Sequence, residues 1–211
     1  MNFLRCMFLI VFATTLSIAQ SVQSTMPITP PNEPEVLVQS LYRQVVARAP
    51  VGLLHGEDRK IFDPYLSKSL LHRIELAHSC EKDWYRQNPD SEKPLSSSNR
   101  AVGILKPPFA WLEAGLFSGG DEKTSPGSFQ IESTQAEKNG SFRVVVRLTY
   151  RASDGPGFWR VAAIVIREND HFVVDDVIYL KDVNQHVEWR LSQRLSSGCN
   201  GSHWVGYGEA K

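Results

Sequence analysis

Cysteine is scarce in this sequence, and neither sign of charge is in excess. The chain of 211 residues holds 3 cysteines, and its 23 Lys and Arg are balanced by 23 Asp and Glu. Binding to nucleic-acid phosphates needs clustered cations, and no basic tract stands out here. We therefore expect no nucleic-acid partner. With 42% hydrophobic and 22% charged residues, the composition is typical of a globular domain.

The common sequence motifs of catalysis and cofactor binding are also missing. No Gly-x-Ser-x-Gly occurs, which argues against a hydrolase nucleophile of that type. The glycine-containing stretches at 119–120 and 155–157 are interpreted as turns, because neither has the spacing of a phosphate-binding loop. We therefore expect no cofactor.

One helical segment carries residue types that bind metals, at a spacing that does not suit a metal site. His72, Glu75, His78 and Glu81 follow one another at steps of three. Each step turns a helix by about −60°, so the four side chains fan around half of its surface and do not converge. A Glu-x-x-His pair is half of a di-iron site, and the second half is absent. We predict no metal site here and interpret these residues as a solvated helix face.

Long apolar runs are absent except at the N-terminus. Residues 1–19 contain one early cation, Arg5, then an unbroken apolar run and a small-x-small sequence at 17–19. This pattern predicts a cleaved secretory signal peptide, with an uncleaved N-terminal anchor as the alternative. No later segment reaches the roughly 20 apolar residues of a membrane span, so we expect no stable span after cleavage. The polar, proline-rich residues 20–33 are predicted to form a flexible leader.

The predicted signal peptide implies export to the periplasm or the outside of the cell. Two cysteines, Cys80 and Cys199, remain after its cleavage. Oxidising compartments permit disulfides, and two cysteines allow a single connectivity, so we predict a Cys80–Cys199 bond. Two free thiols are the alternative. The bond would close a long loop and stabilise the fold by up to about 4–5 kcal/mol in the chain-entropy model.

Apolar residues recur at helical spacing in three segments, and start and stop signals bound them. The predicted helices are 34–48, 63–87 and 183–196. Pro34 occupies a first helical position, and Asp63 is a capping acid before a proline. Asn88-Pro89 ends the second helix and Gly198 the third. Residues 88–127 are loop-like, but their central sequence KPPFAWLEAGLFSGG predicts a packed, partly helical segment.

From residue 128 onward the apolar period changes to two. The predicted strands are 128–136, 142–151, 158–167 and 171–180. Asn139-Gly140 is a strong hairpin signal, and four strands joined by tight turns predict an antiparallel meander. We predict an α+β fold in which N-terminal helices pack on a curved four-stranded meander, a cone formed by residues 34–182. A C-terminal helix and a disulfide-tethered tail over 183–211 follow.

Two stretches carry a resemblance to a known superfamily. They are FDPYLSKSLL in the second predicted helix and FRVVVRLTY…FWRVAAIVIRENDHFVVDDVIYL across the strands. On these residues the chain resembles the nuclear transport factor 2-like (cystatin-like) superfamily, and more closely its exported bacterial members that are grouped as a domain of unknown function. The resemblance covers residues 34–182 and implies the cone-shaped fold rather than an activity. It also implies pairing into a homodimer through the outer face of the sheet.

Two adjacent acids, Asp175 and Asp176, interrupt the apolar last strand. Neighbours in a strand point to opposite faces, so the two cannot form a carboxylate dyad, and Asp176 is expected on the same face as Val174. One interpretation is structural, with one acid paired with an arginine and the other anchoring a helix or loop end. The other is catalytic, because enzymes of the resembling superfamily use one acid inside the cone as a general base. Tyr150 or Tyr179 would then polarise a carbonyl group of the substrate.

The favoured function follows from four aromatic side chains and from the absence of catalytic residues that converge on one place in the predicted fold. Phe109, Trp111, Phe117 and Trp159 are predicted to wall an apolar pocket, with filling of the core as the alternative. We favour a non-catalytic exported domain that binds a small apolar molecule or a protein partner. An isomerase- or dehydratase-type enzyme is one alternative. A cell-envelope immunity or inhibitor protein, acting through the 103–127 loop or the C-terminal tail, is the other.

Overall fold

The structure is a computed structural model, and it describes residues 33–89, 91, 107–120, 124–152, 155–180 and 188–207. The predicted signal peptide over 1–19 and all but the last residue of the predicted leader over 20–33 lie outside these residues. The described part is an α+β fold of helices and an antiparallel sheet of five strands, with a second sheet of two strands. Within it, each helix is too short or too polar to cross a membrane.

The main sheet is an antiparallel meander with one short strand added at its edge. Its strands follow one another in the order β1 (Ser128–Ala136), β2 (Phe142–Ala152), β3 (Gly155–Glu168), β4 (His171–Tyr179) and β5 (Trp189–Arg190). Gly140, at φ +84°, forms the turn between β1 and β2, which confirms the hairpin that Asn139-Gly140 predicts. β3 is the central strand, and its residues from Val161 to Val165 are all buried, which requires cover on both faces.

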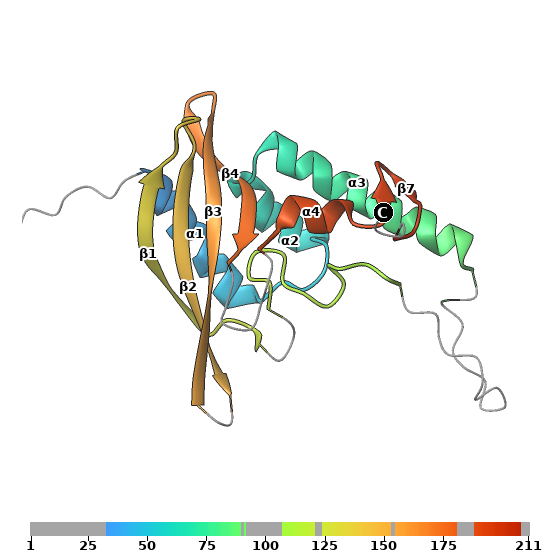
Figure 1. Ribbon diagram of the computed structural model, residues 1–211, viewed down its shortest axis with the longest axis horizontal. Coiled ribbons are helices and arrows are strands. Elements are labelled where there is room, and N and C mark those ends of the chain that lie inside the picture. The colour runs from blue at the N-terminus through green and yellow to red at the C-terminus, as the bar shows by residue number, and fades with distance from the viewer. Residues whose placement is uncertain are drawn as a thin grey trace, which may run out of the picture. The chain divides into compact units, whose positions relative to one another are not determined.

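The first helix, α1 (Glu33–Arg48), confirms the predicted helix over 34–48. Val38, Leu41 and Val45 recur every three or four residues and are buried along one stripe of the helix. Acids in its first turn and Arg48 in its last turn are favourable to the helix dipole. Figure 1 shows α1 lying across one face of the sheet, where it contacts β1, β2 and β4.

The second predicted helix is wrong at its start. Gly56–Phe62 forms a short helix, α2, that sequence periodicity does not reveal, and Asp63–Tyr65 forms a single 3₁₀ turn. The long helix α3 spans Lys68–Gln87 and is capped by Ser67, whose Oγ accepts a hydrogen bond from the third helical N–H at 2.9 Å. The 3₁₀ turn cannot continue into α3, because Leu66 is extended and pairs with β4 as an isolated bridge.

The C-terminal helix is shorter than the sequence predicts. α4 covers Leu191–Ser196, whereas residues 189–190, predicted inside a 183–196 helix, form strand β5 against β4. Pairing with the sheet takes up the backbone groups that a helix would use. Residues 183–187 lie outside the described part of the chain. The tail continues as a hairpin of two short strands, β6 (Cys199–Asn200) and β7 (His203–Trp204).

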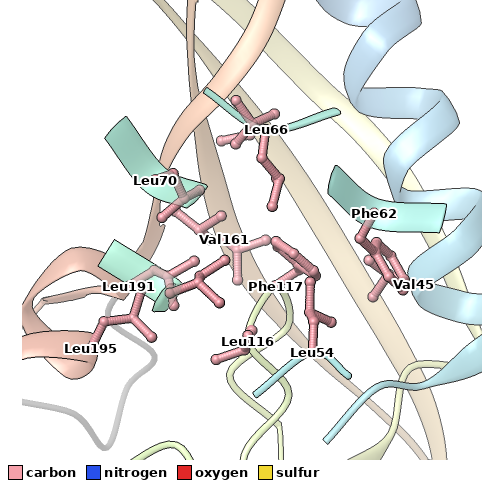
Figure 2. Packing of buried hydrophobic residues seen from close by; sticks show 14 of the residues in the cluster. Val45, Leu54, Phe62, Leu66, Leu70, Leu116, Phe117, Val161, Leu191 and Leu195 are labelled. Atoms are coloured by element: carbon pink, nitrogen blue, oxygen red, sulfur yellow. The ribbon is translucent and has the colours of Figure 1, made fainter. Parts of the chain in front are cut away.

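The main hydrophobic core lies between the helices and one face of the sheet. Val45 of α1, Leu70 of α3, Val161 of β3 and Leu191 of α4 belong to this one cluster, and each is at most 1% exposed. Figure 2 shows these side chains converging from elements that are far apart in the chain. Because burial of apolar surface is the dominant favourable term in folding, this shared cluster holds the helices on the sheet.

The described part of the predicted packed segment, residues 107–120, is largely buried but is not helical. It consists of turns and irregular chain, so the expected partial helix is wrong there. Two buried tyrosines satisfy its backbone carbonyls, because Tyr42 donates a hydrogen bond to Phe117 at 2.8 Å and Tyr179 donates one to Leu116 at 2.6 Å. These bonds fix the segment against α1 and β4 in place of a helical hydrogen-bond ladder.

A disulfide and one buried acid hold the C-terminal hairpin. The predicted Cys80–Cys199 disulfide is present and joins β6 to α3. Asp83, one turn further along α3, accepts a hydrogen bond from the backbone N–H of Trp204 at 3.0 Å. That bond, together with the neighbouring Arg86, holds the pKa of the Asp83 carboxyl below its usual value. The tail is therefore tied to the same helix by a covalent bond and by polar contacts.

Removal of the disulfide is expected to destabilise the protein strongly. The bond joins residues 119 positions apart, and the chain-entropy model assigns such a loop about 5 kcal/mol. A Cys80→Ala/Cys199→Ala variant should therefore lose unfolding free energy of this order, measured by urea denaturation under oxidising conditions. A reducing agent should lower the midpoint of the wild type and leave that of the variant unchanged. Equal midpoints for the oxidised wild type and the variant would contradict the prediction.

The contact between Asp83 and the tail is expected to weaken in acid. The pKa of Asp83 is lower in the folded chain than in the unfolded chain, where it is about 3.9. Ionised Asp83 therefore stabilises the fold above the unfolded-state pKa, and this contribution is lost as the pH falls through the folded-state pKa. The protection factor of the Trp204 amide in hydrogen exchange should drop as the pH is lowered through about 4 and below. In Asp83→Asn it should be low and independent of pH; unchanged protection in that variant would refute the contact.

Candidate functional site

Asp175 and Asp176 lie at an irregularity in the pairing of β4 with β3. Val174 is opposite Val165 and Asp176 is opposite Ile164, so Asp175 is an extra residue in a β-bulge. A bulge shifts the alternation of side chains along its strand. The prediction that Asp176 shares a face with Val174 is therefore wrong, because it assumed an unbroken period of two.

Beyond the bulge, Asp176 lies on the face of the sheet that is turned away from the main core. The next residue, Val177, belongs to the main core, and neighbours in a strand point to opposite faces. Ile164, the partner of Asp176, belongs to a small separate cluster with Ala162 and Ile178. Asp176 is accordingly not directed into the apolar space between the sheet and α1.

Asp175 holds the start of the long helix α3. Its Oδ1 accepts a hydrogen bond from the hydroxyl of Ser67 at 2.6 Å. Ser67 is the fully buried N-cap residue of α3, and its backbone N–H also donates to the carbonyl of Val174 at 2.9 Å. The Ser67 hydroxyl thus gives its proton to Asp175 and accepts from the helix, so one carboxylate orients the whole cap.

Asp176 holds the start of the short helix α4. Its two oxygens accept hydrogen bonds from the backbone N–H of Ser192 at 3.0 Å and from the Ser192 hydroxyl at 2.7 Å. Arg190 lies 3.6 Å away, while the Asp176 side chain is 10% exposed. A nearly buried carboxylate needs such donors, because its desolvation is otherwise too costly. The two acids therefore bind serines at the starts of two different helices.

A pocket of about 360 Å³ opens at one end of the sheet, near the ends of β2 and β4 and the start of β3. Its aromatic lining residues are Tyr150, Phe158, Trp159, Tyr179 and Trp189. The volume is at the lower end of the range for small-molecule sites, which runs from about 300 to about 1,000 Å³. The pocket is therefore large enough for a compact ligand and offers rings on which that ligand can stack.

Two glycines allow two of these rings to approach the backbone closely. Gly157 is paired with Tyr150 across β2 and β3, and a Cβ there would come 2.3 Å from the Tyr150 ring. A Cβ on Gly119 would come 2.6 Å from the Tyr179 ring, and the φ of Gly119 is +71°. Any side chain at these positions would push the rings away, and at Gly119 it would strain the backbone as well.

Hydrogen bonds fix two of the rings in place. The Trp159 indole N–H donates to the carbonyl of Ser118 at 2.7 Å, and Trp159 packs on Tyr150 with ring centres 5.6 Å apart. Tyr179 donates its hydroxyl proton to Leu116, and burial raises the pKa of Tyr179 above its usual value, with the positive charge of Arg194 opposing that rise. Tyr179 is therefore a neutral, anchored wall residue over the physiological pH range.

The four aromatic residues that are predicted to bind a ligand do not all lie at the pocket. Trp159 lines the pocket. Phe109 stacks on Trp111 with ring centres 4.6 Å apart, and Phe117 stacks on Phe62 at 5.2 Å, all within the main core. Tyr150 and Tyr179, nominated as catalytic partners, line the pocket, whereas neither aspartate is among its described lining residues.

Sequence reasoning did not find Trp189 and Arg194 as pocket residues. Both come from the segment that follows the meander and folds back beside β4 as β5 and α4. No local motif marks them, because they reach the pocket only through the pairing of β5 and the anchoring of α4. Among the described residues, no group of three or more His, Cys, Asp or Glu is placed to hold a metal ion.

Loss of the Asp176 charge is expected to destabilise the fold. Hydrogen bonds to charged groups contribute about 1.5–3 kcal/mol, and Asn at this position keeps the size but replaces one acceptor with a donor. Asp176→Asn should lower the free energy of unfolding by about 1–3 kcal/mol in urea denaturation. The matched control is Asp170→Asn in the exposed turn before β4, which should change stability by less than about 0.5 kcal/mol. If both variants unfold at the midpoint of the wild type, Asp176 does not anchor α4.

Comparisons of the chain with protein-family models, with curated proteins and with solved structures each found no match. The resemblance to the nuclear transport factor 2-like superfamily therefore stays a prediction from the sequence. The chemistry of the site rests on the geometry of the described residues.

Proposed function

We propose that the protein is an exported, non-catalytic binding protein that holds a small apolar, ring-containing molecule in the pocket at the end of the sheet. The observation that carries this proposal is the pocket wall, where Tyr150, Trp159 and Tyr179 come from three neighbouring strands. Concave sites lined by aromatic rings, with a few fixed polar groups, are typical of small-molecule binding.

The positions of the acids support binding over isomerase or dehydratase chemistry. A general base has to lie within hydrogen-bond reach of the proton that it removes. Asp175 and Asp176 are each bound to a serine at a helix start, and the hydroxyl of Tyr179 is bound to Leu116. The described lining of the pocket contains neither Asp nor Glu. The two aspartates and the Tyr179 hydroxyl are thus held in structural hydrogen bonds, which supports ligand binding without catalysis.

The disulfide supports the exported location in this proposal. Disulfides persist in oxidising compartments and are rare where thiols are kept reduced. The Cys80–Cys199 bond joins the tail to α3, and an oxidising compartment would preserve this bond. The order of helices followed by an antiparallel meander also supports membership of the nuclear transport factor 2-like superfamily, although fold alone does not assign activity.

Binding of a neutral apolar probe, 1-N-phenylnaphthylamine, tests the proposed function. Its fluorescence should rise on titration with the protein as the probe leaves water. Trp159→Ala should weaken binding about tenfold, because a stacked ring contributes about 0.5–1.5 kcal/mol beyond the area that it buries and 1.4 kcal/mol corresponds to a factor of ten. Gly157→Val should weaken binding similarly, because the added side chain displaces Tyr150.

Tyr207→Ala is the matched control, since Tyr207 is an exposed aromatic residue in the tail and is not among the described pocket residues. It should leave the affinity for the probe unchanged. Thermal unfolding of each variant separates loss of binding from loss of fold. The proposal fails if the probe does not bind, or if Trp159→Ala and Tyr207→Ala bind it as tightly as the wild type.

A further inference from the structure

Arg194 is the pocket residue whose charge the proposed function leaves unused. It lies in α4, and its guanidinium carbon is 4.2 Å from the centre of the Tyr179 ring. The face of an aromatic ring attracts a cation, and α4 is anchored two residues earlier, where Asp176 binds Ser192. The positive charge is therefore held at a defined place on the pocket wall.

No acid in the described part of the chain forms an ion pair with Arg194. Its Nη1 atom is shielded from water and has no hydrogen-bond partner. A buried donor without an acceptor is unfavourable, and more so when it belongs to a charged group. An acceptor that reaches this guanidinium would offset that cost.

Two other cations near the pocket, Arg160 and Arg190, are already engaged with acids. Arg160, which also lines it, donates hydrogen bonds to both carboxylate oxygens of Glu132, at 2.6 and 3.1 Å. Arg190 lies 3.6 Å from Asp176. Because the described lining contains no acid, Arg194 gives the pocket a positive potential that an incoming ligand would meet.

We propose that the ligand of this pocket carries an anionic group, a carboxylate or a sulfonate, attached to a compact apolar ring system. The anion binds the guanidinium of Arg194, and the ring lies against Tyr150 and Trp159. This inference rests on the proposed function and adds the charge of the ligand to it. Guanidinium binds a carboxylate through two parallel hydrogen bonds, so we expect Arg194 to turn toward the anion on binding.

The same geometry argues against a cationic ligand. Aromatic walls alone would suit a quaternary ammonium group, since cations bind to the faces of Trp and Tyr rings. Here Arg194 already occupies the Tyr179 face, and a second cation in the pocket would be repelled by it. The sign of the ligand charge is therefore decided by Arg194 rather than by the rings.

Three probes that share one ring and differ in the head group test this inference. They are 1-naphthaleneacetate, the neutral 1-naphthaleneacetamide and the cationic 1-naphthylmethylammonium, each titrated into the protein by isothermal calorimetry. We expect the anion to bind at least about tenfold more tightly than the amide, and the ammonium to bind most weakly. Raising the salt from about 0.05 M to about 0.5 M should weaken binding of the anion and leave that of the amide unchanged.

Arg194→Gln removes the charge and keeps hydrogen-bonding capacity. This variant should bind the anion and the amide within about twofold of each other, because only the anion loses a charged partner. Arg43→Gln, a change at an exposed arginine of α1, is the matched control and should keep the preference for the anion. Arg194→Lys, which keeps the charge, should retain a preference that salt reduces, and it serves as the reference if Arg194→Gln folds poorly.

The outcomes distinguish the two proposals. If the amide binds, and the anion binds no more tightly than the amide, the inference about charge is wrong and the proposed function stands. If the cation binds best, the inference is also wrong. If none of the three probes binds, the proposed function fails, and the inference fails with it. A preference for the anion that persists unchanged in Arg194→Gln would place the anion site elsewhere and overturn the assignment.

Discussion

Two hydrogen-bonded carboxylates at the centre of β4 determine where the helices meet the sheet. Asp175 binds Ser67 at the start of α3, and Asp176 binds Ser192 at the start of α4. Both acids sit at one β-bulge, so two adjacent positions of one strand hold the starts of two different helices. The apolar core supplies most of the driving force for folding, but apolar contacts are not directional. These polar bonds give the helices a defined position.

The pocket is a consequence of that arrangement. Anchoring of α4 by Asp176 places Arg194 over the ring of Tyr179, and pairing of β5 with β4 brings Trp189 to the same end of the sheet. The strands supply the remaining wall. The hydrogen bonds that Asp176 makes to Ser192 therefore also position Arg194, the cation of the proposed binding site. Structural and functional roles are linked here through one short helix.

Two glycines at the pocket and one disulfide at the tail also shape the fold. Gly119 and Gly157 give two tyrosine rings room to lie against the chain, so the pocket depends on residues that contribute no side chain to it. At the other side of the described fold, the Cys80–Cys199 bond and Asp83 hold the C-terminal hairpin on α3. The disulfide and the Asp83 contact limit the conformational freedom of the short C-terminal hairpin.

The sequence by itself determined the class of fold, the helix α1, the first four strands and the cysteine pairing. These follow from local periodicity, from the Asn139-Gly140 turn and from the presence of two cysteines outside the predicted signal peptide. The tertiary structure alone decided the start of α3, the length of α4, the faces of the two aspartates and the membership of the pocket. Periodicity assumes an unbroken strand or helix, whereas the bridge at Leu66, the bulge at Asp175 and the pairing of β5 are contacts between distant segments. Their energies are absent from any local window of residues, and so is the placement of Arg194 that follows from them.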